Sequence, residues 1–318
     1  MMLGDSTPRA WAAVPAVVLA LALLGAHFLR AGEPGLAVAM LGCISLACTR
    51  LAWVRTALLG VLGWGLWIWL DAATALVRLR VALDAPWLRL AIIMGVVLAV
   101  TGLGLLLLAG PRARRWYAGK AQTAAAQGAA FLLAGGGLLL ARAQASIPVL
   151  LLDRFQVFGI GGWGPLEAFV LAVYAAWITR LLLDIRRTAR VRSWLWFGFS
   201  AAFFLQLALG LAGLERFLMT GSLHLPVPAL ILAGPVFRGG GVFMLVLFSA
   251  TVLLAGPAWC SHFCYIGAWD DRLSRLGGGA ARAASAPVLR RWRVAGRLAA
   301  LVLTVGGALA LRLAGVSA

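Results

Sequence analysis

Long apolar runs separated by short polar connections make up almost the whole chain. A helix needs about 20 mostly apolar residues to cross a hydrocarbon core of ~30 Å, and it satisfies its own backbone hydrogen bonds there. The pattern predicts an all-α fold, a polytopic transmembrane helix bundle of about nine spans, with eight to ten as the range. The nine runs are 11–28, 36–54, 57–77, 88–109, 123–141, 165–183, 194–214, 240–258 and 294–316.

The spacing of these runs also divides the chain. We expect a bundle of about eight helices at 1–258, a connection with the cysteine motif at 259–293 and a final transmembrane helix at 294–318. Two connections, 147–164 and 222–239, carry short apolar pieces that contain proline. Such pieces are too short to span, so we expect them to lie at the membrane interface, with re-entrant loops as the alternative.

Composition excludes a water-soluble globular protein. Hydrophobic residues make up 63% of the 318 positions, charged residues only 12%, and the mean hydropathy is +0.97. The formal net charge of +18 does not indicate nucleic-acid binding, because the basic residues lie between apolar runs, where they meet lipid head groups. The partner that composition predicts is the lipid bilayer, with no nucleic acid.

The distribution of basic residues predicts the orientation. With the N-terminus in the cytoplasm, nineteen of the 28 arginine and lysine residues fall in inner connections and nine in outer ones. Inner connections of membrane proteins are enriched in these residues. We therefore expect a multi-pass protein of the inner (plasma) membrane, with the N-terminus and the segment around Cys260 in the cytoplasm.

Two cysteines and a histidine lie close together in the longest polar connection. Cys260 and Cys264 are four residues apart, so on a helix their side chains share one face, about 5–6 Å from each other. That distance and a cytoplasmic location disfavour a disulfide and favour two thiolates that bind one metal centre. In a loop, His262 joins them as a third metal ligand. A tetrahedral zinc site or a cubane cluster takes four ligands, so the pair is half a site.

The segment 256–268 resembles the junction of membrane-bound 4Fe-4S polyferredoxins, the family that passes electrons between quinols and periplasmic nitrate or nitrous-oxide reduction. In that family a tryptophan or phenylalanine precedes a Cys-x3-Cys-Pro element that follows a transmembrane helix. The matching residues are Trp259, Cys260, Cys264, Gly267 and Asp270, and Tyr265 stands where the family has proline. The family carries a second such pair and further ferredoxin cysteines, which this sequence lacks.

The resemblance implies that this chain corresponds only to the membrane portion of such a protein. We therefore expect the chain to be truncated or to work with a partner. It implies a 4Fe-4S cluster, completed by a missing segment, by a redox partner subunit or by a cysteine-rich ferredoxin module. The predicted function is electron transfer between a quinol pool and a redox partner, as a component rather than a stand-alone enzyme. The alternative is a non-redox membrane transporter, or an assembly or scaffold protein with a partial metal site.

Ionisable residues near the outer ends of spans are candidates for the quinol site. Glu167 or His224 would accept a proton from a quinol hydroxyl. His27 and His224 are alternatively candidate axial ligands of a haem iron. We interpret the other two cysteines, Cys43 and Cys48, as small apolar core residues. The alternative is that Cys48 approaches the Cys260 pair. We also expect Trp259 and Trp269 to pack the cysteine motif onto the bundle.

Overall fold

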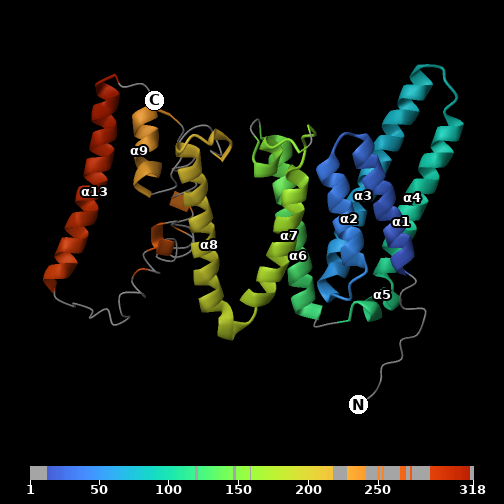
Figure 1. Ribbon diagram of the computed structural model, residues 1–318, viewed down its shortest axis with the longest axis horizontal. Coiled ribbons are helices and arrows are strands. Elements are labelled where there is room, and N and C mark those ends of the chain that lie inside the picture. The colour runs from blue at the N-terminus through green and yellow to red at the C-terminus, as the bar shows by residue number, and fades with distance from the viewer. Residues whose placement is uncertain are drawn as a thin grey trace, which may run out of the picture. The chain divides into compact units, whose positions relative to one another are not determined.

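The computed structural model is all-α and divides into two compact units, Met1–Ile185 and Arg186–Ala318 (Figure 1). It describes residues 13–118, 121–145, 148–157, 159–217, 228–240, 246, 249–250, 253, 266–269, 273 and 287–315. The two units are treated separately below.

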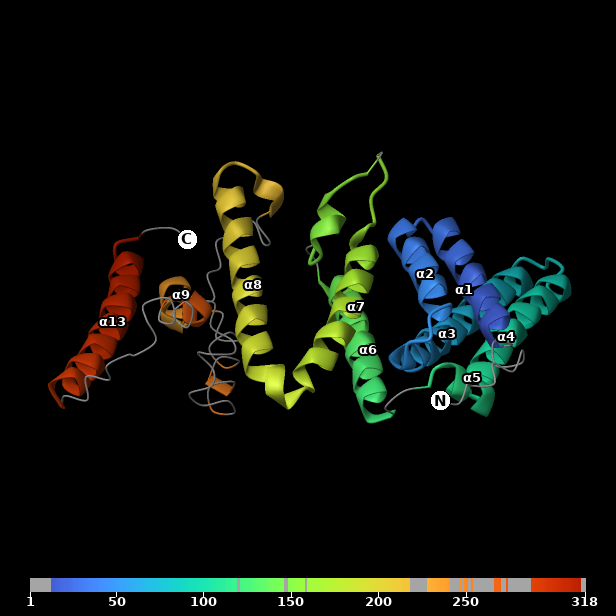
Figure 2. The same cartoon turned by 60° about the horizontal axis from the view of Figure 1, so that its bottom comes forward.

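Seven α-helices form the first unit. They pack as antiparallel neighbours, α1 on α2, α3 on α4 and α6 on α7, and α3 also packs on α6 (Figure 2). Further contacts join α1 to α4 and α2 to α7. The helices are α1 (Ala13–Arg30), α2 (Pro34–Ala47), α3 (Ala52–Ala82), α4 (Leu88–Ala109), α5 (Pro111–Trp116), α6 (Ala121–Gln144) and α7 (Gly164–Leu182), with a short 3-10 helix, η2 (Leu151–Arg154), before α7.

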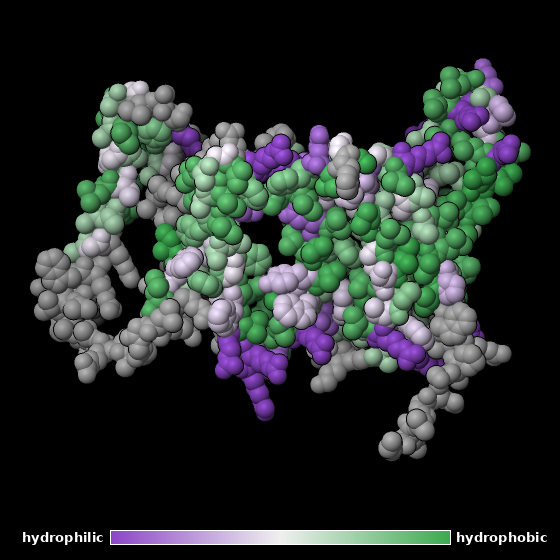
Figure 3. Space-filling model, viewed as in Figure 1, coloured by the Kyte–Doolittle hydropathy of each residue, from purple (hydrophilic) through white to green (hydrophobic). Residues whose placement is uncertain are grey.

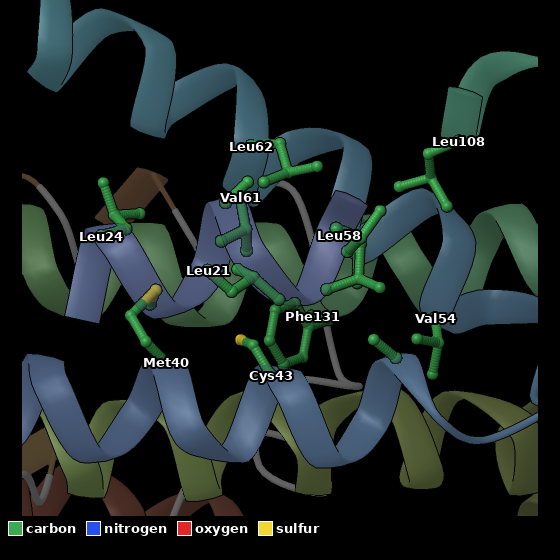
Figure 4. Close-up of a cluster of buried hydrophobic side chains, with 14 of the residues drawn as sticks. Leu21, Leu24, Met40, Cys43, Val54, Leu58, Val61, Leu62, Leu108 and Phe131 are labelled. Carbon is green, nitrogen blue, oxygen red and sulfur yellow. The ribbon is translucent and has the colours of Figure 1, made fainter. Parts of the chain in front are cut away.

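The core of the first unit lies between α1, α2, α3 and α4. Leu21, Leu58, Leu62 and Leu108 are each at most 1% exposed and converge there (Figure 4). Large apolar side chains also cover the outside, as the broad hydrophobic bands of Figure 3 show. A helix that is apolar on every side is stable only where lipid replaces water, so this surface fits a bilayer.

Glycines let neighbouring helices approach closely. A Cβ at Gly42 of α2 would lie 2.5 Å from the ring of Phe169 on α7. A Cβ at Gly128 of α6 would lie 2.5 Å from Thr56 Cβ and 3.1 Å from the Trp53 carbonyl oxygen on α3. Because apolar burial does not drive helices together inside lipid, such close contacts supply much of the packing energy.

In the second unit, α8 (Ile185–Leu211) is followed by a short 3-10 helix, η3 (Glu215–Phe217), by α9 (Pro228–Arg238) and by α13 (Pro287–Leu313). The helices α9 and α13 pack against each other. Arg312 near the end of α13 donates a hydrogen bond of 3.2 Å to the Val236 carbonyl, which belongs to the last turn of α9. This contact satisfies one of the carbonyl groups that a helix C-terminus leaves without an intrahelical donor.

Among the described residues, six helices are long and apolar enough to cross a membrane, not nine. The expected span 36–54 is wrong: α2 has 14 residues, about 21 Å of helix, and Val54 already belongs to α3. The expected span 294–316 falls on α13 (Pro287–Leu313), whose described apolar stretch, Leu298–Leu313, is counted among the shorter apolar helices and not among the six. The expected span 240–258 lies almost wholly outside the described residues.

The other expected spans coincide with observed helices. The run 88–109 is α4, with the same ends, and 165–183 differs from α7 by one residue at each end. The run 57–77 lies inside α3, whose 31 residues make a helix of about 46 Å. The structure thus confirms an all-α, multi-pass membrane protein.

Candidate functional site

The segment that follows the cysteine motif packs onto α8. Residues 266–269 are helical, and the Trp269 ring meets Phe197 at a centroid distance of 4.9 Å and Phe204 at 6.4 Å. Both contacts are edge-to-face, the arrangement that aromatic quadrupoles favour. Phe197 and Phe204 are seven residues apart, two turns of α8, so they lie on one face. Trp269 itself therefore packs on α8. Trp259 and the cysteine motif lie outside the described residues, so the expectation that the two tryptophans pack the motif onto the bundle stays a prediction.

The indole nitrogen of Trp269 is buried. Over the part of the chain that the structure describes, Trp269 Nε1 has no hydrogen-bond partner. The neighbouring Ala268 is 5% exposed. A buried donor without an acceptor costs about 1–3 kcal/mol. The same holds for the indole nitrogens of Trp69 and Trp116 in the first unit.

The three predicted metal ligands, Cys260, His262 and Cys264, lie outside the described residues, and their coordination stays a prediction. Within the described ranges no group of three histidine, cysteine or acidic side chains could hold a metal ion. Cys43 is 2% exposed in the core of the first unit, which agrees with its interpretation as a small apolar residue. Cys48 is exposed, so its interpretation as a small core residue is wrong. The alternative, that Cys48 approaches the Cys260 pair, stays untested.

Comparison with known families adds the deciding observation. The model of a family described as a 4Fe-4S binding domain matches residues 237–283. The chain contains a 4Fe-4S binding domain. The matched segment begins at the end of α9 and includes both cysteines of the motif, His262 and Trp269. No curated protein and no solved structure matches the chain.

The residues of the 4Fe-4S binding domain fit part of such a cluster. A cubane cluster is held by four thiolates, and the domain holds two cysteines, Cys260 and Cys264, four residues apart in the sequence. The buried indole N–H of Trp269 lies in the same domain, five residues after Cys264. The protein is therefore a membrane protein with a 4Fe-4S binding domain, consistent with electron transfer.

A cluster of charged side chains lies in the first unit, where α6 ends and α7 begins. Arg142 Nε donates a 2.8 Å hydrogen bond to Asp153 Oδ2, and Arg142 Nη2 forms an ion pair of 3.2 Å with Glu33 Oε2. Asp153 Oδ1 also accepts a 2.9 Å hydrogen bond from the Gly164 backbone N–H, the first of α7. Asp153 therefore ties the connection before α7 to the ends of both helices.

Glu167, the predicted proton acceptor for quinol, lies in the first turn of α7. Its Oε2 accepts a 2.8 Å hydrogen bond from the Leu152 backbone N–H, so it holds η2 against α7. A carboxylate is stabilised at this position, because backbone N–H groups and the helix dipole favour negative charge there. His224, the other candidate, lies outside the described residues. The sequence did not predict that Arg142 and Glu33 join Asp153 in the charged cluster described above. The only signal in the sequence is that each is a charged residue near the end of a helix.

His27, the candidate haem ligand, lies in the last turn of α1 among aromatic rings. Its ring centroid is 4.9 Å from that of Trp69 and 5.7 Å from that of Phe28. Its suggested partner His224 lies outside the described residues, so the haem alternative stays a hypothesis.

The opposite end of the first unit is basic. Arg55 donates hydrogen bonds of 2.9 and 3.0 Å to the Leu108 and Ala109 carbonyls, which closes the C-terminus of α4. Arg50 lies 4.4 Å above the Trp116 ring, a cation–π contact. On the short helix α5, Arg112, Arg114 and Arg115 add three positive charges to this end. Clusters of this kind are typical of the cytoplasmic face.

Proposed function

We propose that this protein carries electrons within the membrane between a quinol pool and a redox partner, through a 4Fe-4S cluster bound at Cys260 and Cys264. The observation that carries the proposal is the family match over 237–283, which includes both cysteines in a chain with six candidate membrane spans. The resemblance of 256–268 to membrane-bound polyferredoxins supports it further.

In this proposal the Cys260 and Cys264 thiolates ligate iron, and His262 is the third ligand that the segment offers. A bound 4Fe-4S cluster supplies one-electron transfer. A cubane cluster takes four ligands, so one further thiolate is needed when His262 binds and two when it does not, and they would come from a redox partner subunit or from a cysteine-rich ferredoxin module. The protein sits in the inner membrane with the N-terminus and the cysteine motif in the cytoplasm, as its arginines predict.

Oxidation of a quinol releases two electrons and two protons. Glu167 or His224 is the proposed proton acceptor, and a cluster held by Cys260 and Cys264 would supply one-electron acceptance. Glu167 Oε2 already accepts the hydrogen bond from the Leu152 backbone N–H, and a carboxylate has further lone pairs with which to accept from a quinol hydroxyl.

Electron delivery to the cluster tests the proposal. The purified protein, in anaerobic proteoliposomes with its partner module, would be mixed with a reduced quinol while the visible absorbance of the cluster is followed. We expect bleaching in the wild type and none in the double variant Cys260→Ser, Cys264→Ser. The matched control is Cys43→Ala, because Cys43 is buried in the core of the first unit.

Two outcomes of this experiment contradict the proposal in different ways. A wild-type cluster that dithionite reduces but quinol does not would remove the quinol link. Unchanged absorbance in the double variant would remove the assignment of Cys260 and Cys264 as ligands. The competing non-redox function would be favoured by a wild-type protein that shows no cluster absorbance and whose cysteines react freely with alkylating reagents.

A further inference from the structure

The short helix α5 is fixed at one end of the first unit by three contacts with other elements (Figures 1 and 2). Arg55 in the first turn of α3 donates two hydrogen bonds to the last carbonyl groups of α4, directly before α5. The Arg50 guanidinium lies 4.4 Å from the centroid of the Trp116 ring, and the Tyr117 hydroxyl bonds to the end of α2. These contacts place the side chains of Arg50 and Arg55 beside α5.

The helix α5 adds three exposed positive charges, Arg112, Arg114 and Arg115, to these two. Arg55 and Arg114 lie close enough for their charges to repel each other. Among the described residues, no carboxylate forms an ion pair with any of the five arginines. The carboxylates of the charged cluster described above lie at the opposite end of the unit. Because like charges without a counter-charge repel, this end of the first unit favours a bound anion.

Two of the guanidinium groups carry N–H donors that are already oriented. Arg55 uses two of its five N–H groups on carbonyl oxygens, which leaves three. Arg50 uses the face of its guanidinium on Trp116, so the N–H groups at its edge stay available within the described part of the chain. Guanidinium groups bind phosphate oxygens through paired N–H bonds, and side chains that are already held lose less entropy on binding. Phosphate is therefore the anion that these arginines fit.

Apolar surface borders the arginines. Leu106 in the last turn of α4 is 71% exposed, and Leu51 directly before α3 is 44% exposed. With 22 residues, α4 is about 33 Å long, enough to cross the hydrocarbon core, so α5 lies at the level of the lipid head groups. The hydrophilic patch at this end borders the hydrophobic surface (Figure 3). Acyl chains pack on exposed leucines, whereas a free phosphate ion does not, so the fitting ligand is a phospholipid.

We propose that the arginines around α5 bind the phosphate groups of an anionic phospholipid, with Arg50, Arg55 and Arg114 as phosphate ligands. The acyl chains lie on Leu51 and Leu106. A lipid with two phosphates, such as cardiolipin, fits best, because five positive charges exceed what one phosphate neutralises. General attraction of basic residues to a membrane is not saturable, whereas this site takes one lipid. The site needs neither the cluster nor a quinol, so it is independent of the proposed function.

Native mass spectrometry of the purified full-length protein in detergent tests the site by titration with cardiolipin, phosphatidylglycerol and phosphatidylcholine. We expect one cardiolipin to bind most tightly, phosphatidylglycerol more weakly and phosphatidylcholine least. The double variant Arg50→Gln, Arg114→Gln should bind cardiolipin about tenfold more weakly or worse, since two charge-assisted contacts are lost. Arg55 is left in place, because its loss would also free the carbonyl groups of α4. The matched control, Arg78→Gln with Arg80→Gln, removes the same charge at exposed positions near the other end of α3 and should bind as the wild type does.

Three results would overturn the proposal. The first is equal cardiolipin affinity in the wild type and in the Arg50, Arg114 double variant. The second is phosphatidylcholine binding as tight as that of cardiolipin. The third concerns the source of the phosphate: inorganic phosphate, at the concentration at which cardiolipin saturates the protein, should not raise the unfolding temperature, and a rise equal to that with cardiolipin would make this a site for a free anion.

A measurement on the unaltered protein covers the case in which the double variant does not fold. Cardiolipin with a photoreactive diazirine next to its glycerol would be bound and irradiated, and the cross-linked peptides would be identified by mass spectrometry. We expect cross-links in the peptides that contain 50–51 and 106–116. Cross-links confined to other segments would overturn the proposal.

Discussion

At the scale of single residues, Tyr117 shows how a buried polar group connects distant parts of the first unit. It follows α5, is 4% exposed, and its hydroxyl donates a 2.7 Å hydrogen bond to the Ala47 carbonyl at the end of α2. Burial, and to a lesser extent the charge of Cys48, raises the pKa of Tyr117 from 10.0 to about 12. The neutral phenol is therefore the form that the folded protein requires.

We predict that Tyr117→Phe lowers the stability of the detergent-solubilised protein by about 0.5–1.5 kcal/mol at neutral pH, since the hydrogen bond to Ala47 is lost. The wild type should also lose stability as the pH rises from about 10 through about 12. Above pH 10 the unfolded chain releases the phenolic proton and the folded protein does not, so unfolding becomes more favourable. Thermal unfolding as a function of pH measures both effects. An equal alkaline decline in Tyr117→Phe would contradict this account.

At the scale of helices, the contact between α3 and α6 depends on a glycine. A Cβ at Gly128 would meet Thr56 and the Trp53 backbone, whereas a Cβ at Gly136 on the same helix meets no atom within 4 Å. We predict that Gly128→Ala lowers stability by about 1–3 kcal/mol, because the two backbones must separate. Gly136→Ala should raise it slightly, since alanine favours a helix. Thermal unfolding of the two variants, measured side by side, tests this prediction. Equal changes in stability would refute the close-packing argument.

The sequence predicted helices well where polar residues interrupt the apolar pattern sharply. The run 88–109 is followed by a glycine, a proline and several arginines, and α4 ends there. The run 36–54 failed because the apolar residues on both sides of Arg50 were joined into one span across that arginine. In the structure Thr49 Oγ1 donates to the Leu46 carbonyl and Leu51 is extended, so α2 ends and α3 begins within that run. The single charge of Arg50 was the signal of this turn, and the long apolar stretches around it outweighed it.

Of the candidate site, only the metal-binding chemistry of its two cysteines could be predicted from the sequence. The spacing of Cys260 and Cys264 is visible in the sequence, and the family match covers it. The contacts of Trp269 with Phe197 and Phe204 join residues about seventy positions apart, which no local pattern reveals. The cluster of Glu33, Arg142 and Asp153 likewise needs the folded connection before α7. Tertiary contacts of this kind depend on packing, which a single sequence does not encode locally.

At the scale of the whole molecule, the basic residues predict the orientation in the membrane. We predict that a cysteine at Ile185→Cys, 92% exposed between α7 and α8, faces the cytoplasm. A cysteine at Leu83→Cys, 67% exposed after α3, should face the opposite side. The measurement is labelling by a membrane-impermeant maleimide in right-side-out and inverted vesicles, with the native cysteines replaced by serine. The reverse labelling pattern would place the cysteine motif outside and contradict the charge argument.

The central claim is that Cys260 and Cys264 hold a 4Fe-4S cluster, and chemical analysis of the anaerobically purified protein tests it most directly. We predict iron and acid-labile sulfide in equal amounts in the wild type and in Cys43→Ala. Cys260→Ser with Cys264→Ser should lose both, because oxygen ligands replace the thiolates poorly. Full iron and sulfide content in the double variant, or none in the wild type, would contradict the account.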